Sequence, residues 1–327
     1  MRKLQYDNFI KARDYIFKYG DDVNRAWFRY LFEGNDTDMF LNVLSKHQYE
    51  NGGFGGIYYE FAYQGPCLKA TEIAVKYILN LKEKPSAVHP LIQNMMQYIL
   101  GLYIPEIGNW GEVVVPAVND EPHCYWLRYG EEDITPIGDE EERIKRYNAN
   151  ERVCFAAFVS YYAELVSQDV YFDIIKYPIE YILRYWDKNS PYYNKRIFDS
   201  GEPYDMEYFQ WFVPCLRDKR TADRLASVLC QNPTAFMELD YEKAEKDYVH
   251  LPCDVVGDPD SIVYPVVKDL VLDSLQYRMK RQGGDGRWPL GWSFGDAEGL
   301  QNLQMKYETY CTLAMLEKLD RFGMIEK

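Results

Sequence analysis

The chain has 327 residues, of which 47 % are hydrophobic and 27 % are charged, and it contains 30 tyrosines. This composition is typical of a folded chain with enough apolar material for a core, and it excludes a disordered protein. The formal net charge of −14 argues against nucleic acid and against an anionic membrane surface, because both partners need clustered Lys and Arg. We therefore expect no nucleic-acid partner.

Neither a membrane span nor a secretory leader is expected. No segment approaches the roughly 20 consecutive apolar residues that cross a bilayer. Residues 1–17 lack an uninterrupted apolar stretch and a small-residue cleavage site, so they predict an amphipathic helix. The seven cysteines are scattered without a Cys-x-x-Cys pair, which is typical of buried free thiols in a reducing compartment. The predicted location is the cytoplasm.

Helical spacing of apolar residues recurs along the whole chain. After the N-terminal helix, the apolar stripes of the predicted helices fall within residues 39–44, 73–81, 91–102, 154–165, 225–229 and 303–316. Asp36 or Thr37 is expected to cap the first of these helices, and Thr221 the fifth. Residues 113–115 are the best strand candidate, and this stretch is short. The sequence therefore predicts an all-α fold.

Loops rich in Gly and aromatic residues separate the predicted helices at regular intervals. They lie at residues 47–56, 102–111 and 281–292, with weaker versions at 185–193 and 230–236. Their spacing is about 50 residues, apart from one wider gap that a polar insertion at residues 112–149 fills. That period is one helical hairpin plus its loop, and five or six hairpins can close a ring. We expect residues 1–327 to form a single α/α toroid, with the insertion over the mouth of its cavity.

The strongest of these loops share a pattern of glutamine, glycines and an aromatic residue. Gln48 and Gln282 fall at predicted helix ends, where a side-chain amide can bond orphan carbonyls. The glycines that follow permit a positive φ and a tight reversal. Phe54, Trp110 and Trp288 then supply an aromatic ring that can tuck under the hairpin. These units are expected to stabilise the ring, and they need no ligand.

The same units resemble the repeats of a known superfamily. Residues 48–56, Gln-x-x-x-Gly-Gly-Phe-Gly-Gly, followed by Thr71-x-x-Ala-Val, are similar to the repeat of protein prenyltransferase β-subunits and squalene cyclases, and residues 282–288 resemble a second copy. Residues 119–126 and 250–260 resemble bacterial proteins with prenyltransferase/squalene-oxidase-type repeats. The resemblance implies the α/α toroid of the terpenoid cyclase and protein prenyltransferase superfamily.

The chain departs from the motifs that carry that superfamily's best-known chemistry. Its only Asp-Asp pair, Asp21-Asp22, follows Tyr19 where the Asp-x-Asp-Asp motif of class II cyclases has its first aspartate. The same pair lacks the last member of the Asp-Asp-x-x-Asp magnesium motif. No cysteine follows an aspartate by two residues, as the zinc site of prenyltransferases requires. The resemblance therefore implies the fold but not the reactions of class II cyclases, magnesium-dependent synthases or zinc-dependent prenyltransferases. We expect no metal and no cofactor.

The segment at residues 250–261 is the richest candidate site. Asp254 and Asp258 are the candidate acid and base, provided that burial beside one another shifts their pKa values apart. Asp260 or Ser261 is expected to cap the next helix. The alternatives are a purely structural loop, a cation site whose carboxylate spacing does not match the EF-hand, or thiol chemistry by Cys253 with His250 as its base.

Further candidates come from histidine, acidic and aromatic residues elsewhere. His123 is a third candidate catalytic residue, and Trp126 beside it is a candidate ligand-binding residue; both lie in the insertion, where the alternative is a role in packing the loop. The helix at residues 204–211 mixes acids with aromatics on one face, which suits either a polar cavity or an amphipathic surface. The remaining candidate ligand-binding residues are His250, Asp205, Trp211 and Trp292, the last at the rim of the pocket.

Several functions remain open at this level. A central cavity lined by Tyr and Trp is expected to hold a small-molecule ligand. The first hypothesis is an acid–base enzyme, with an isoprenoid-like or other apolar substrate implied only by the resemblance. A carbohydrate-active enzyme is an alternative, because aromatic faces stack on sugars and paired carboxylates cleave glycosides. A non-catalytic binding or scaffolding protein and a protein-interaction module are the others. The oligomeric state stays open.

Overall fold

The computed structural model describes residues 2–111, 113–130, 139, 144, 147, 149–193, 204–235, 237–245 and 249–326. This part of the chain is mostly helical, with twelve α-helices and one two-stranded sheet, so the predicted all-α class is confirmed. None of the helices in these residues is long and apolar enough to cross a membrane.

The α-helices in chain order are α1 (Tyr6–Tyr19), α2 (Asp22–Phe32), α3 (Thr37–Leu44), α4 (Leu68–Leu79), α5 (Pro90–Gly101), α7 (Asn150–Tyr161), α8 (Gln168–Tyr185), α9 (Tyr204–Cys215), α10 (Lys219–Leu229), α11 (Pro252–Val255), α12 (Tyr264–Met279) and α13 (Leu300–Arg321). Short 3-10 helices are η1 (Ser45–His47), η2 (Pro116–Asp120), η3 (Tyr125–Leu127), η4 (Ala163–Leu165) and η5 (Lys243–Glu245). Strand β1 (Tyr103–Ile104) pairs antiparallel with β2 (Asn109–Trp110).

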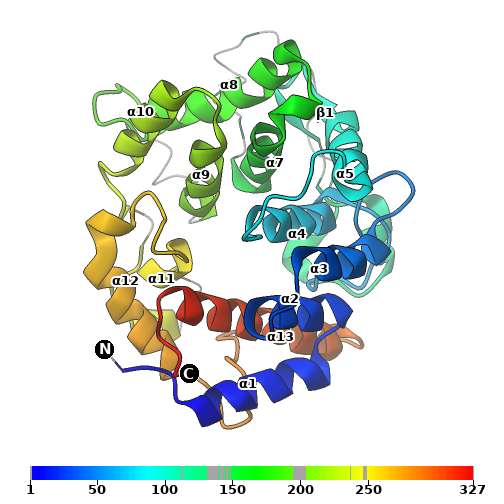
Figure 1. The fold of residues 1–327 in the computed structure, drawn as a ribbon, viewed down its shortest axis with the longest axis vertical. Helices are drawn as coiled ribbons and strands as arrows, with labels where there is room; N and C mark the ends of the chain where they lie inside the picture. The colour runs from blue at the N-terminus through cyan, green and yellow to red at the C-terminus, as the bar shows by residue number, and fades with distance from the viewer. Residues whose placement is uncertain are drawn as a thin grey trace.

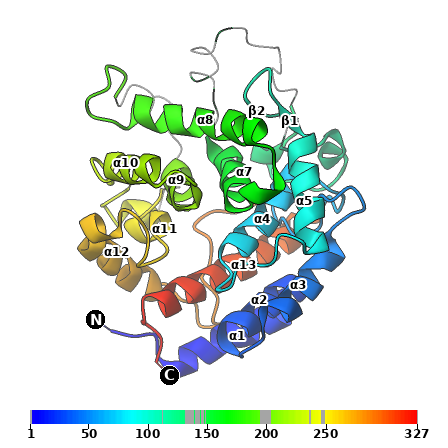
Figure 2. The same cartoon turned by 45° about the horizontal axis from the view of Figure 1, so that its top comes forward.

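The helices follow one another around the molecule in chain order (Figure 1). In this view α2, α4, α7, α9, α11 and α13 lie toward the middle, while α1, α5, α8, α10 and α12 lie outside them. The tilted view in Figure 2 shows the same order. Among the inner helices, α4 packs on α7, α7 on α9, α9 on α11, and α13 on α2. Helix α13 thereby returns to the start of the chain.

The two ends of the chain are held together. The backbone N–H of Leu4 donates to the carbonyl of Met324 at 2.7 Å, and the N–H of Glu326 donates to the carbonyl of Leu4 at 2.9 Å. The amide of Gln276 bonds the backbone of Arg2 in both directions, as donor at 2.6 Å and as acceptor at 3.2 Å. One cluster of buried apolar side chains runs through the structure from Leu4 to Ile325.

The two glutamine loops have matching geometry, and their bonds differ from the prediction. Gln48 Nε2 donates to the carbonyls of Gly52 and Leu91, both at 3.0 Å. Gln282 Nε2 donates to those of Gly286 at 2.8 Å and Asn8 at 2.9 Å. Each glutamine therefore closes its own loop and fastens it to the first turn of another helix, α5 or α1. The expected acceptors were orphan carbonyls at the end of the preceding helix.

In two of the loops a tryptophan bonds a carbonyl near the end of the helix before it. The indole N–H of Trp110 donates to the carbonyl of Ile99 at 2.8 Å, near the end of α5. The indole N–H of Trp288 donates to that of Arg278, also at 2.8 Å, in the last turn of α12. Both rings are buried. The aromatic residue of the loop therefore caps the helix before it, which explains why two of these positions carry a ring with a donor.

Three local predictions are wrong. Residues 113–115 form no strand, and the pairing occurs earlier, between β1 and β2. Helix α10 is capped by Asp218, whose carboxylate accepts from the N–H groups of Arg220 and Thr221. Helix α12 begins after Val263 without a side-chain cap. Asp260 N–H instead donates to the carboxylate of Asp258 at 2.7 Å and closes a turn within the loop. The predicted Asp36 cap of α3 is confirmed.

All seven cysteines are free thiols, as the sequence predicted. Four are buried and three are half-buried. No group of three or more His, Cys, Asp or Glu side chains in the described residues could hold a metal ion.

Candidate functional site

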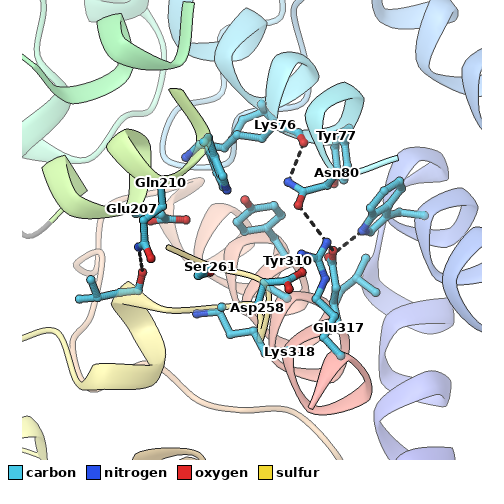
Figure 3. Close-up of a pocket in the computed structure, with 18 residues that line it drawn as sticks. Lys76, Tyr77, Asn80, Glu207, Gln210, Asp258, Ser261, Tyr310, Glu317 and Lys318 are labelled. Carbon is cyan, nitrogen blue, oxygen red and sulfur yellow. Dashed lines mark hydrogen bonds and ion pairs between the residues drawn. The ribbon is translucent and has the colours of Figure 1, made fainter. Parts of the chain in front are cut away.

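A pocket of about 140 Å³ opens between the inner helices α2, α4, α9, α11 and α13 (Figure 3). Its walls repeat the helical period: α4 contributes residues 73, 76, 77 and 80, and α13 contributes residues 310, 313, 314, 317, 318 and 321. A helix facing an ordinary core would place apolar side chains at this spacing. Here the spacing brings charged and aromatic side chains inward, so these faces line a polar site.

Lys76 projects from α4 into this pocket and is held by a buried carboxylate behind it. Its Nζ lies 2.7 Å from Glu72 Oε1. Tyr208 Oη donates to the same oxygen at 2.5 Å. The ammonium also lies 4.9 Å from the centre of the Tyr208 ring and 5.7 Å from that of Trp211. Burial alone would lower the pKa of Lys76, but the neighbouring groups, with Glu72 foremost, together outweigh it and raise the pKa, so this amine stays protonated.

A second wall is an ion-pair network around Arg321 on α13. Its guanidinium lies 2.6 Å from Asp258 Oδ2 and 2.5 Å from Glu317 Oε1, and it donates to Asn80 Oδ1 at 2.9 Å. The other oxygen of Glu317 accepts from the indole of Trp27 at 2.9 Å. These bonds join α2, α4 and α13 to the loop after α11. The network fixes the shape of this side of the pocket.

Two charged groups in the pocket have no such partner. Glu207 on α9 and Lys318 on α13 form no hydrogen bond and no ion pair with the described part of the chain. Burial raises the pKa of Glu207, and the charges of Lys76 and Lys318 oppose that rise without cancelling it. Figure 3 shows both side chains beside the space that Tyr310 and Ser261 also border. A carboxyl group with a raised pKa is suited to acid–base work.

Two tyrosines add hydroxyl groups to the same space. Tyr77 is only 6 % exposed, and its Oη has no hydrogen-bond partner among the described residues. Burial raises the pKa of Tyr77 and that of Tyr310, so both hydroxyls are neutral donors at ordinary pH. A buried hydroxyl without a partner is destabilising by about 1–3 kcal/mol. Such a group at the wall of a pocket suits a ligand that accepts its hydrogen bond.

The structure brings two of the sequence-predicted site residues into this pocket, Asp258 and Trp211. Asp258 is paired with Arg321 there. Asp254 lies outside the lining, where its carboxylate contacts Arg278 at 2.5 Å and accepts from Leu251 N–H at 3.0 Å. Burial would raise the pKa of Asp254, but the charges of Arg278 and Lys318 and the hydrogen bond from Arg278 together outweigh it and lower the pKa. As a carboxylate that caps α11, Asp254 has an evident structural role, and its catalytic role stays a prediction.

The other predicted residues lie away from the pocket. Burial lowers the pKa of His250 to about 4, so its imidazole is neutral at ordinary pH. Asp205 is buried and accepts from Tyr181 Oη at 3.2 Å. His123 Nδ1 lies 2.8 Å from the carbonyl of Glu121, in a loop that pairs with Phe61. None of the three lines the described pocket.

Trp126 and Trp292 both contact a small second cluster of apolar side chains that contains Phe294. Trp126 meets the Phe294 ring edge-on, with centroids 5.6 Å apart, and Trp292 packs against the same cluster. Of the predicted insertion over the cavity mouth, residues 112, 131–138, 140–143, 145–146 and 148 lie outside the described residues. The described residues 113–130 contribute nothing to the lining of the pocket.

Sequence reasoning missed Lys76, Tyr310 and Lys318, and it named the helix of Glu207 without choosing that residue. A pattern was present on α13, where residues 310, 314, 317, 318 and 321 form one face that mixes tyrosine, alanine and charge. The sequence-based prediction used only the apolar residues of this helix, and those residues alone indicate an ordinary core helix. Polar residues at core spacing were the available indication of a site.

No family model matches the chain, and neither the search of curated proteins nor that of solved structures finds a match. The geometry of the pocket is therefore the basis of the functional argument.

Proposed function

We propose that the protein is an α/α toroid whose central pocket binds a small polar molecule. Three observations support the ring: the helices follow chain order around the molecule, the two chain ends pair, and the glutamine loops repeat. The helices that border the pocket are all inner ones in Figure 1. A pocket surrounded by inner helices is the expected ligand site of such an architecture.

The lining favours a polar ligand over an isoprenoid hydrocarbon. Lys76, Glu207 and Lys318 all border the space, together with the Arg321 network. An apolar ligand would strip water from these groups without replacing its hydrogen bonds, which is strongly unfavourable. The size points the same way: about 140 Å³ is close to the roughly 150 Å³ cavity that admits a single benzene ring. The ligand, or the part of it that enters, is therefore small.

The observation that carries this proposal is Glu207, a carboxyl group without a protein partner inside a bordered pocket. Glu207 is half-buried, so in the free protein water in the pocket can reach its carboxyl group. A ligand that donates to this group would replace that water. The same group is the candidate proton donor or acceptor for a reaction on the ligand.

A pocket-filling variant tests the proposal. Ala314 lines the pocket from α13, so Ala314→Trp places an indole in the ligand space. Gln301→Trp makes the same change at an exposed position of the same helix. Ligand-observed NMR with a mixture of sugars, polyols, amino acids and dicarboxylates is expected to detect binders of the wild type and of Gln301→Trp that Ala314→Trp fails to bind. Circular dichroism confirms that each variant is folded, and Ala314→Phe replaces Ala314→Trp if it is not.

Two results contradict the proposal. One is a wild type that binds no member of the mixture at millimolar concentration. The other is a set of binders that folded Ala314→Trp retains in full.

A glycoside-cleaving enzyme is the second candidate function. It is favoured by two carboxyl groups, Glu207 and Asp258, that border one pocket with the rings of Trp211 and Tyr310. Glu207, whose pKa burial raises, would act as the acid, and Asp258, the carboxylate that Arg321 holds, would act as the base. A panel of nitrophenyl glycosides and oligosaccharides tests this. Hydrolysis that Glu207→Gln lowers by about 10²-fold or more supports it, whereas binding without hydrolysis leaves a non-catalytic binding protein.

A further inference from the structure

Most charged side chains around the central pocket form ion pairs. Arg321 pairs with both Asp258 and Glu317, so two carboxylates share one guanidinium, and Lys76 pairs with Glu72. Glu207 and Lys318 remain, one anion and one cation, each without an ion pair in the part of the chain that the structure describes. Every other charged side chain that lines the pocket has its countercharge in the protein.

These two groups share the pocket without meeting. They project from different helices, α9 and α13, whose positions the surrounding packing fixes. The charge of Lys318 is felt at Glu207, where it opposes the rise in the pKa of the carboxyl group. No ion pair forms between them, although both lysine and glutamate have long side chains. Both side chains are half-buried. A ligand that displaces water from them loses affinity unless it supplies the countercharges.

Resting on the proposed binding function, we infer that the natural ligand is amphoteric: its ammonium group pairs with Glu207, and its carboxylate pairs with Lys318. The chemical class is that of amino acids and short amino carboxylates. The pocket's volume of about 140 Å³ suits a molecule of that size.

The remaining lining fits the same class. Trp211 and Tyr310 offer ring faces to the carbon skeleton between the two charges. The hydroxyl of Tyr77 is buried without a partner, and it can donate a hydrogen bond to a carboxylate. A simple amine would leave Lys318 unpaired, and a simple carboxylate would leave Glu207 unpaired. Selectivity therefore follows from the desolvated charge that each wrong ligand leaves behind.

Matched probes of one skeleton test this inference. Titration calorimetry compares 5-aminopentanoate with pentylamine and pentanoate, and the same triad is repeated for 4-aminobutyrate and for norvaline. We expect at least one amphoteric compound to bind at least about tenfold more tightly than both of its singly charged analogues.

Variants assign the two ends of the ligand. Glu207→Gln is expected to reduce the affinity for the amphoteric probe to that of its carboxylate analogue, and Lys318→Met to that of its amine analogue. Glu50→Gln and Lys46→Met remove the same charges at exposed positions near η1 and should leave the affinity unchanged. The charge-reversed double variant, Glu207→Lys with Lys318→Glu, keeps both charges and should recover part of the binding that either single reversal loses.

The outcomes separate this inference from the proposed function. Analogues with a single charge that bind as tightly as the amphoteric probe overturn the inference, as does full affinity in folded Glu207→Gln. If sugars or polyols bind the pocket and Ala314→Trp excludes them while no amphoteric probe binds, the proposed function stands and the inference fails. If no compound binds at all, both fail.

Discussion

In the free protein, the Glu207 carboxyl group affects how folding stability depends on pH. Glu207 faces Lys76 from α4 and Lys318 from α13, together with the acidic groups Glu72 and Asp254, and burial raises its pKa. A raised pKa in the folded state means that folding favours the protonated form. The contribution of Glu207 to stability is therefore greatest below the ordinary glutamate pKa, and it is lost as the pH rises through the raised value.

Glu207→Gln should accordingly stabilise the protein at alkaline pH. Glutamine keeps the shape and removes the charge that burial penalises. We expect the free energy of unfolding to increase by about 1 kcal/mol at pH 8, and the gain to vanish near pH 4. Urea denaturation across this range measures it, with the exposed Glu50→Gln as the control. A variant less stable than the wild type at pH 8 would mean that Glu207 makes a stabilising contact in the protein.

Residue chemistry also explains why the sequence pointed to Asp254 more strongly than to Glu207. The loop at residues 250–261 concentrates aspartates, and their proximity in sequence suggested an acid and a base. Whether such groups meet each other or meet arginine depends on distant parts of the chain. Arg278 on α12 and Arg321 on α13 pair with Asp254 and Asp258, and neither pairing is visible in the loop itself.

Among the helices and loops, the glutamine units are the part of the fold that sequence reasoning predicted best. Their recurrence, their glycines and their buried aromatic rings are all present. The partners of the glutamine amides were wrong, since these lie on α5 and α1 rather than at the preceding helix end. A local pattern can show that a side chain bonds backbone, but only packing decides which backbone arrives beside it.

Removing either glutamine should weaken the fold to a similar degree. Gln48→Ala and Gln282→Ala each remove the side-chain donor from two carbonyls. One of these carbonyls is in the loop itself, and the other is on α5 for Gln48 or on α1 for Gln282. We expect each variant to lose about 1–3 kcal/mol of unfolding free energy, measured by chemical denaturation. Gln93→Ala, at an exposed position of α5, should change stability by less than about 0.5 kcal/mol. Equal losses in all three variants would show that the glutamine bonds add nothing.

At the scale of the whole molecule, the second glutamine loop, residues 282–288, makes a contact that the first does not. Through Gln282 it binds α1, so it joins the C-terminal part of the chain to the N-terminal helix. Gly286 has φ of +97°, and a Cβ on it would lie 2.3 Å from the backbone of Lys11. Only glycine permits both this backbone conformation and this close approach.

Gly286→Ala should therefore loosen the contact between the two ends of the chain. We expect a loss of about 3 kcal/mol or more, because the strained backbone and the clash act together. Gly284→Ala is the matched control two residues away, where an added Cβ meets nothing within 4 Å. Hydrogen exchange should show that protection falls first in α1 and in the Leu4–Ile325 pairing. Uniform loss of protection along the chain would mean that this contact does not act as a separate closure.

The sequence by itself determined the helical class and the recurring loops between helices. These features depend on apolar spacing and turn chemistry within a few neighbouring residues, so they can be read along the chain, whereas two of the predicted caps were wrong. The tertiary structure decided which polar side chains meet. Glu207 and Lys318 share a pocket because α9 and α13 face the same space, and Asp254 is removed from it by Arg278. Pairing of charges is a property of distance in space, which spacing along the chain does not contain.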